Sequence, residues 1–346
     1  MILPESKFFK SSDFLVSDGN VLQDLTIAYQ TWGELNSNKD NAILICHGYT
    51  NHHFPEDQNV GWFNNLMGFG KAVDTNKYFV ICANMLGSSF GSTGPKSINP
   101  ITNLPFGSDF PLITNIDIIN TQKLLIENLK IRKLHSIIGY SFGGHLVYLW
   151  ATEFPNMMKS IVSIAGSFDR WDVSKEKIEL IEEPFSNCKN WNNGHYYSLD
   201  RSEIDKALID YRINVLNFYG FKDYLLSLDY SLELVNKKVV EAAKGWAKYF
   251  DPNSLIILRR ANLNSSASNK ASKIQVPILK VLAKSDKVTN MVQGKSTVQK
   301  FASLGINFTF IELNTKFGHH GPMCEPDEWS KELQLFLNNN NNNIII

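Results

Sequence analysis

A serine stands between two glycines in the stretch Gly139–Gly143, which reads GYSFG and matches the pattern G-x-S-x-G. A short apolar run precedes this stretch, and a longer one, FGGHLVYLWATEF, overlaps and follows it. Such a pattern predicts a sharp strand-to-helix turn that presents the serine hydroxyl above a sheet, with the helix N-terminus behind it to stabilise negative charge. We therefore predict that Ser141 is a nucleophile. The alternative is a glycine-rich turn whose serine only caps the helix.

A serine hydroxyl needs a base to become nucleophilic near neutral pH, and the base needs an acid to orient it. In sheet enzymes with this turn, the chain order is serine, then aspartate or glutamate, then histidine, with the last two on loops after late strands. Asp286 ends the run VPILKVLAKSD, and His319 and His320 follow NFTFIELNTKFG. Both histidines are candidates for the base, and we favour His319 because it directly follows Gly318.

Two backbone N–H groups are expected to hold the oxygen that becomes negative during acyl transfer. One belongs to Phe142, directly after the serine, and the best candidate for the other is Tyr49 in the segment CHGYTNHH. The histidines of that segment, His47, His52 and His53, also raise the question of a metal site. Because no carboxylate or cysteine completes a recognisable ligand pattern there, we expect no metal. His47 is expected to shape the loop.

The segments that carry these candidates alternate between two kinds. Short, continuously apolar runs predict strands covered on both faces, as in a parallel sheet. These runs occupy residues 41–49, 77–87, 134–141, 160–167, 276–286 and 307–314. Helical stretches such as 115–129 lie between them, so we predict an α/β fold with a mostly parallel sheet flanked by helices.

The alternation stops after residue 167, and helical segments then follow one another without a buried strand. We predict that residues 1–167 and 273–337 form the core and that residues 168–272 form a helical lid over one end of the sheet. The last segment, 338–346, is rich in asparagine and is expected to be a disordered tail.

The composition excludes few functions but favours a soluble protein. The 346 residues include 34 Lys and Arg and 34 Asp and Glu, so the net charge is zero and no excess favours nucleic acid or an anionic membrane. No apolar run approaches the roughly 20 residues of a membrane helix, and the first residues lack the pattern of a secretory signal. The four cysteines, at positions 46, 82, 188 and 324, lack the spacing of zinc or redox motifs. We expect a cytoplasmic protein.

Over residues 25–337 the chain resembles the homoserine O-acetyltransferase family of α/β-hydrolases. The most specific likeness lies in 61–100, which contains GSTGP and SINP, and the likeness continues in order through FDPNSLIILRRAN and FGHH. The resemblance implies a triad of Ser141, Asp286 and His319, an acyl-serine intermediate and a helical lid through which two copies dimerise. It also implies acyl-CoA as a co-substrate, an amino-acid hydroxyl as acceptor and no permanently bound cofactor.

Two positions depart from the usual pattern of that family. Its members usually carry aspartate directly after the catalytic histidine, where it meets the amino group of homoserine, and this chain has His320 there. They also usually carry a lid arginine that receives the homoserine carboxylate, and an alignment on WNNG places Glu182 or its neighbours at that position. Each change would cost about 2 kcal/mol in binding homoserine, which together is about a thousandfold. Homoserine itself is therefore expected to be a poor acceptor.

Three functions are compatible with these residues. We favour an O-acyltransferase, and the alternative is a carboxylesterase or thioesterase that uses the same triad; a non-catalytic binding protein is the third. Transfer requires a lid that positions an acceptor well enough to outcompete water. We expect Tyr140 to contact the substrate, together with His320 and Glu182. Aromatic residues that could line an apolar acyl pocket are Tyr140, Phe54, Phe142 and Trp171.

Overall fold

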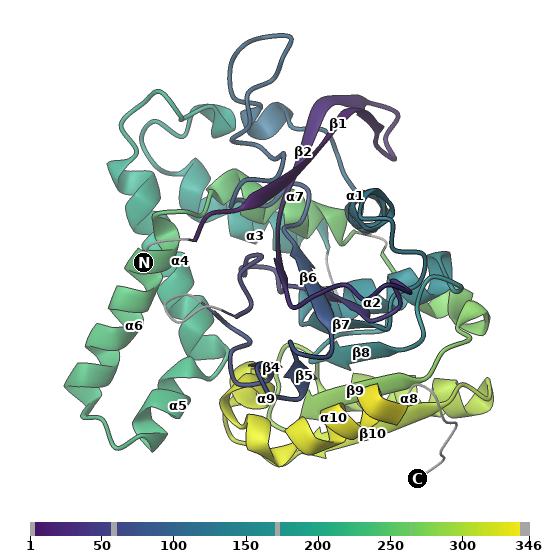
Figure 1. Cartoon of the computed structure of the whole chain (residues 1–346). Coiled ribbons are helices and arrows are strands. Elements are labelled where there is room, and N and C mark those ends of the chain that lie inside the picture. The colour runs from purple at the N-terminus through teal and green to yellow at the C-terminus, as the bar shows by residue number, and fades with distance from the viewer. Residues whose placement is uncertain (1–3, 57–60, 170–173, 264, 340–346) are drawn as a thin grey trace.

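The sheet at the centre of the molecule confirms the α/β fold expected from the sequence. The computed structural model describes residues 4–56, 61–169, 174–263 and 265–339. Within this part, eight strands form one sheet in the order β1-β2-β6-β3-β7-β8-β9-β10 (Figure 1). Their bounds are β1 Lys7–Leu15, β2 Val21–Trp32, β6 Phe79–Ala83, β3 Ala42–Cys46, β7 Ser136–Tyr140, β8 Ile161–Ile164, β9 Ile278–Ala283 and β10 Phe308–Leu313. Two short strands, β4 Met67–Gly68 and β5 Val73–Asp74, pair separately.

The six strands from β6 to β10 in that order are parallel, and each lies inside one of the apolar runs that predicted a strand. Every residue of β3, β7, β8 and β9 is buried. Strands β1 and β2 form an antiparallel hairpin at one edge, where many side chains are exposed. A strand with one solvated face lacks a continuous apolar run, which is why sequence reasoning did not anticipate this hairpin.

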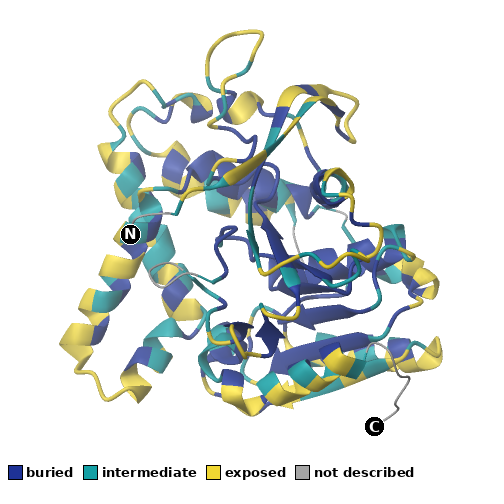
Figure 2. Cartoon of the chain, viewed as in Figure 1, coloured by how far each residue is buried: buried dark blue, intermediate teal, exposed yellow. Residues whose placement is uncertain are grey.

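Helices cover both faces of the sheet, and the side chains of each strand alternate between two cores. Leu44 of β3 belongs to the larger core, which includes much of helix α2, whereas Ile43 and Ile45 face the core that includes Leu333 of α10. Figure 2 shows the buried strands beneath helices whose outer surfaces are exposed. The helices of the core are α1 Asn115–Asn128, α2 Phe142–Glu153, α8 Met291–Ser303, α9 Gly321–Cys324 and α10 Ser330–Asn338.

In the described part of the segment predicted as a lid, the α-helices are α3 Lys175–Ser186, α4 Ser202–Phe218, α5 Phe221–Ser227, α6 Leu232–Ala247 and α7 Pro252–Ala261. Helices α4, α5 and α6 lie beside the sheet on the left of Figure 1 and pack around a small core of their own. Helix α7 packs in the larger core, where Leu255 and Leu258 are fully buried, and Ile204 and Leu208 of α4 are buried there as well. The predicted tail begins at Asn338, the last residue of α10, and its residues 340–346 lie outside the described part.

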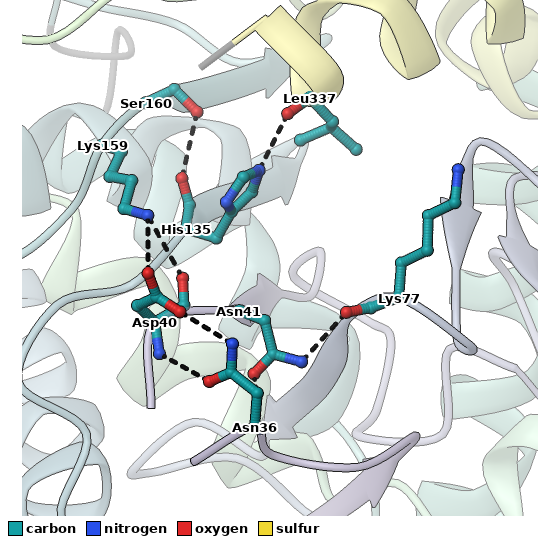
Figure 3. Close-up of polar contacts among 8 residues, drawn as sticks. All are labelled: Asn36, Asp40, Asn41, Lys77, His135, Lys159, Ser160 and Leu337. Carbon is teal, nitrogen blue, oxygen red and sulfur yellow. Dashed lines mark hydrogen bonds and ion pairs between the residues drawn. The ribbon is translucent and has the colours of Figure 1, made fainter. Parts of the chain in front are cut away.

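A network of polar contacts connects the amino-terminal ends of the parallel strands (Figure 3). The side chain of Asn41, directly before β3, donates to the carbonyl of Lys77, two residues before β6, at 2.9 Å. His135, directly before β7, contacts the carbonyl of Leu337 in α10 through Nε2 at 2.8 Å. The network therefore joins strand ends and the C-terminal helix on the side of the sheet away from Ser141.

Candidate active site

Ser141 follows β7 directly and precedes α2, with φ 56° and ψ −115°. This left-handed backbone is costly for any residue other than glycine, by about 1–3 kcal/mol. A Cβ atom at Gly139 would lie 2.1 Å from the carbonyl oxygen of Gly143, and one at Gly143 would lie 1.9 Å from that of Cys46. The two glycines are therefore required for the corner to fit under the neighbouring backbone. The Ser141 side chain makes no capping bond to α2, which excludes the view that it merely caps the helix.

Ser141, His319 and Asp286 form one hydrogen-bonded chain. Nε2 of His319 lies 2.7 Å from Oγ of Ser141, and Nδ1 lies 2.8 Å from Oδ2 of Asp286. All three side chains are at most 4% exposed. Of the two adjacent histidines, His319 occupies the position beside the serine. In this arrangement a neutral imidazole can accept the serine proton while the carboxylate fixes its orientation.

Contacts from several elements hold the histidine and the aspartate in place. Oδ1 of Asp286 accepts hydrogen bonds from the backbone N–H groups of Val288 at 2.7 Å and of Thr289 at 3.1 Å. The Tyr140 hydroxyl donates to the carbonyl of His319 at 3.0 Å. The His319 ring also lies 4.8 Å from that of Tyr219 at the end of α4, centre to centre. The base is therefore positioned by the sheet on one side and by the insertion on the other.

The insertion touches the histidine loop through its backbone. The N–H of His320 donates to the carbonyl of Tyr219 at 3.0 Å. The next residue, Gly220, has φ +91°, and a Cβ atom there would lie 2.2 Å from the carbonyl oxygen of Phe317. Only glycine allows the α4–α5 corner to approach this loop so closely.

The side chains of Tyr49 and Phe142, the two residues predicted to hold an oxyanion through their N–H groups, lie side by side. Their rings stack with centres 6.2 Å apart and planes 12° apart. The Tyr49 hydroxyl donates to the carbonyl of Leu255 at 2.5 Å, which anchors the loop on α7. No described residue accepts a hydrogen bond from the Tyr49 N–H. Phe142 is the first residue of α2, so its N–H belongs to the helix end that favours anions.

Ser141 borders a cavity of about 570 Å³. Helices α4 to α6 of the insertion supply one wall, and the loops after the strands supply the other. The walls are largely aromatic, with Tyr49, Trp62, Tyr140, Tyr219, Phe221, Tyr224 and Trp246 among the lining residues. A cavity of this size and character can hold a drug-sized molecule, so it can admit both an acyl group and an acceptor.

Comparison with known proteins agrees with this geometry. Residues 41–182 match a family model described as the alpha/beta hydrolase fold. A homoserine O-acetyltransferase of Methanobrevibacter ruminantium is 33% identical to this chain over 97% of it and 74% of the relative. The homoserine O-acetyltransferase of Pasteurella multocida is 30% identical over 98% of this chain and 99% of the relative. This chain belongs to the homoserine O-acetyltransferase family of α/β-hydrolases.

Solved structures of similar fold include both transferases and esterases. The homoserine O-acetyltransferase from Bacillus anthracis superposes with a TM-score of 0.82 at 25% identity, covering 98% of each chain. Esterase E22 superposes with a TM-score of 0.84 at 26% identity, covering 96% of this chain and 99% of the esterase. Membership of this family makes the chain a serine-type enzyme of the acyltransferase or ester-hydrolase kind.

Arg212 in α4 is a cation at the cavity that sequence reasoning missed. Its Nη1 donates to the Thr50 hydroxyl at 2.7 Å, and its guanidinium lies 4.9 Å from the centre of the Trp246 ring. Burial lowers its pKa to about 10, which still leaves it charged at neutral pH. Its Nε has no hydrogen-bond partner, and no described carboxylate pairs with it. A charged guanidinium in this setting has the chemistry to bind a ligand carboxylate.

The structure corrects the prediction for Glu182. That residue lies in α3 and borders a different cavity, where its Oε2 lies 3.2 Å from Nη2 of Arg260. It is absent from the described lining of the Ser141 cavity. The arginine that borders the Ser141 cavity, Arg212, comes after WNNG in the chain, whereas Glu182 comes before it. The repulsion expected between Glu182 and a substrate carboxylate therefore does not arise.

His320 borders the cavity, as predicted, with its ring 5.8 Å from that of Tyr219 and 6.0 Å from that of Phe221, centre to centre. Burial, followed by the neighbouring His319 and Arg212, lowers the pKa of His320 to about 3. The side chain is therefore neutral at the position where the family usually has an aspartate.

The aromatic residues proposed for an acyl pocket lie in different places. Tyr140 borders the cavity. Phe54 packs against the ring of His53, 4.1 Å away, and Phe142 lies against Tyr49; neither is among the described lining residues. Trp171 lies outside the described residues.

The histidines of the Tyr49 segment have protein partners. His47 contacts the Gly48 carbonyl through Nδ1 at 2.9 Å and accepts from the Met85 N–H through Nε2 at 3.1 Å. His53 lies 2.8 Å from the Ser6 hydroxyl through Nε2. In the part of the chain that is described, no three His, Cys, Asp or Glu residues are grouped as metal ligands. None of the helices described there is long and apolar enough to cross a membrane.

Proposed function

We propose that this enzyme moves an acyl group from a thioester such as acyl-CoA, through Ser141, to the hydroxyl of a small carboxylic acid. One observation carries the proposal: Ser141 and Arg212, which no described carboxylate pairs with, border the same cavity. His319 and Asp286 support Ser141 through one chain of hydrogen bonds. Ser141 supplies a nucleophile and Arg212 supplies a counter-charge for an acceptor.

In the first half-reaction, Oγ of Ser141 attacks the thioester carbonyl while Nε2 of His319 accepts the serine proton. The negative oxygen of the tetrahedral intermediate receives hydrogen bonds from the N–H groups of Tyr49 and Phe142. Collapse of this intermediate breaks the carbon–sulfur bond, and His319 returns the proton to the thiolate. Asp286 stays ionised throughout and stabilises the imidazolium.

In the second half-reaction, the acceptor hydroxyl gives its proton to His319 and attacks the acyl-serine. The ester bond to Ser141 breaks, and the proton passes from His319 to the serine oxygen. Arg212 binds the acceptor carboxylate, which raises the effective concentration of the hydroxyl at the acyl group. This positioning is what allows an alcohol to outcompete water.

Hydrolysis is the second candidate, because water can replace the alcohol without any change in the machinery. Two observations favour it: His320 stands where family members usually carry aspartate, and esterase E22 is similar over the whole chain. Arg212 favours transfer, since a site for water needs no cation for a carboxylate.

Mass spectrometry of the intact protein tests the proposal. Exposure to a panel of acyl-CoAs should add the mass of one acyl group, and Ser141→Ala should abolish that adduct. A chase with hydroxy acids should remove the adduct faster than buffer alone and yield the acylated acid. An adduct that decays at the same rate with and without acceptors would identify a hydrolase, and no adduct from any thioester would overturn the acyl-CoA donor.

A further inference from the structure

The charges around the cavity are unevenly distributed. Among its described lining residues, the ones that are charged at neutral pH are Arg212 and Glu241. Arg212 is held between Thr50 and the Trp246 ring, deep enough for burial to shift its pKa. Glu241 lies on α6 with an exposed side chain, where water screens its charge. The protected part of the cavity is therefore positive.

Among the residues that the structure describes, none beside the base offers a buried negative charge to a substrate. Asp286 is 3% exposed, and its oxygens are engaged by His319 and by two backbone N–H groups. His320, the next residue after the base, faces Tyr219 and Phe221 as a neutral ring. A carboxylate beside Arg212 would be stabilised by the guanidinium. An ammonium group near His320 would contact aromatic rings and a neutral imidazole instead of an anion.

An ammonium group loses its water when it enters such a site and needs an anion or several acceptors in return. The faces of the aromatic walls return only about 0.5–2 kcal/mol of this cost. An acceptor that has no ammonium group, or whose amine is acylated and neutral, avoids this cost. The aromatic walls would also receive an apolar substituent in place of the ammonium.

We infer that the natural acceptor is a hydroxy carboxylic acid without a free ammonium group, either a plain hydroxy acid or an N-acylated hydroxyamino acid. The inference rests on the proposed acyl transfer through Ser141, and it assigns His320 as the residue that sets the preference. Arg212 recognises the acid, and His320 leaves the amine without a partner.

The test compares three acceptors of matched length: 4-hydroxybutyrate, N-acetyl-L-homoserine and L-homoserine. With the acyl-enzyme formed from acetyl-CoA, either of the first two should be acylated with kcat/KM about tenfold or more above that of L-homoserine. His320→Asp should raise kcat/KM for L-homoserine by about tenfold or more and lower it for 4-hydroxybutyrate. His320→Asn has the same shape without the charge and should leave L-homoserine poor. Glu182→Gln, at the other cavity, should leave the ratio of the acceptors unchanged.

Failure of the inference and failure of the proposed function give different results. If no acyl-enzyme forms, or if it decays only to free acid with all three acceptors, acyl transfer itself is refuted. If the acyl-enzyme forms and L-homoserine equals or exceeds the other two, transfer stands and the inference is wrong. The inference is also overturned if His320→Asp and His320→Asn have the same effect, because charge would then not decide the preference.

Discussion

The two ends of the parallel strands differ in how their polar groups are satisfied. At the carboxyl ends, Ser141 has a strained backbone, and Arg212 is a cation that no described carboxylate pairs with. At the amino ends, Asn41 and His135 bond to backbone carbonyls, and Nζ of Lys159 lies 3.4 Å from Oδ2 of Asp40 (Figure 3). At the carboxyl ends, polar groups remain free to bind a ligand. At the amino ends, the polar groups bind one another within the protein. Activity and stability should therefore respond to different substitutions.

The largest difference between the effect on activity and the effect on stability is expected from Ser141→Ala. Removing the nucleophile should lower kcat by about 10⁴-fold or more, because the remaining groups give only residual catalysis. The melting temperature should change by less than about 4 °C, since one hydroxyl contributes little to folding. Steady-state kinetics and calorimetry on the same preparation provide both values. Unchanged turnover would show that Ser141 is not the nucleophile.

The next effect concerns Arg212. Arg212→Met should raise KM for a carboxylic-acid acceptor by about 100-fold, the loss of roughly one charge-assisted pair. The burst of CoA released on acylation should persist, because that step does not use the acceptor. Arg260→Met is the matched control, since Arg260 pairs with Glu182 at another cavity. Equal increases in KM for both variants would contradict the role given to Arg212.

His135→Ala, at the amino ends, should lower stability and leave activity unchanged. The change removes the partner of the Leu337 carbonyl and the packing of the imidazole against Tyr78, whose ring centre is 4.8 Å away. We expect a loss of about 2–3 kcal/mol in the free energy of unfolding, measured in urea, with kcat unchanged. A fall in kcat at full stability would mean that the two ends are coupled.

The smallest single-residue effect is the part of one histidine in the response of stability to acid, which should come mainly from the carboxyl ends. Burial lowers the pKa of His47 to about 4 and those of His52 and His320 to about 3. An unfolded histidine has a pKa of about 6.5, so below that pH the unfolded state binds more protons and stability falls. The loss should reach about 1 kcal/mol per pH unit for each histidine between pH 6 and 4. In urea unfolding at pH 7 and pH 5, His320→Gln should lose less stability than the native chain; equal losses would contradict the depressed pKa.

The sequence predicted the elements whose signals are local. Continuous apolar runs marked the parallel strands, and the chain order of Ser141, Asp286 and His319 placed them on loops that the structure brings together. The choice of His319 over His320 rested only on its place after Gly318, and geometry agrees with it. These residues could be predicted from the sequence because the ends of the strands in a parallel sheet have few possible positions.

Arg212 could not be predicted from the sequence in the same way. It lies in the middle of an amphipathic helix, where an arginine is ordinary, and only the packing of α4 against Trp246 and Thr50 turns it toward the cavity. Glu182 was mistaken for its counterpart because the helices of the insertion have no fixed spacing from the core. The β1–β2 hairpin was missed for the related reason that its pattern of exposure is set by the edge of the sheet.

The close approach of Gly220 to Phe317 has a consequence for protein engineering. Grafting the α4–α6 helices of a relative onto this core would succeed only if the graft kept a residue without a side chain at that corner and a carbonyl in reach of the His320 amide. A bulkier corner would displace the imidazole from the serine by pushing on its loop, and a chimera built for a new acceptor would fold yet remain inert.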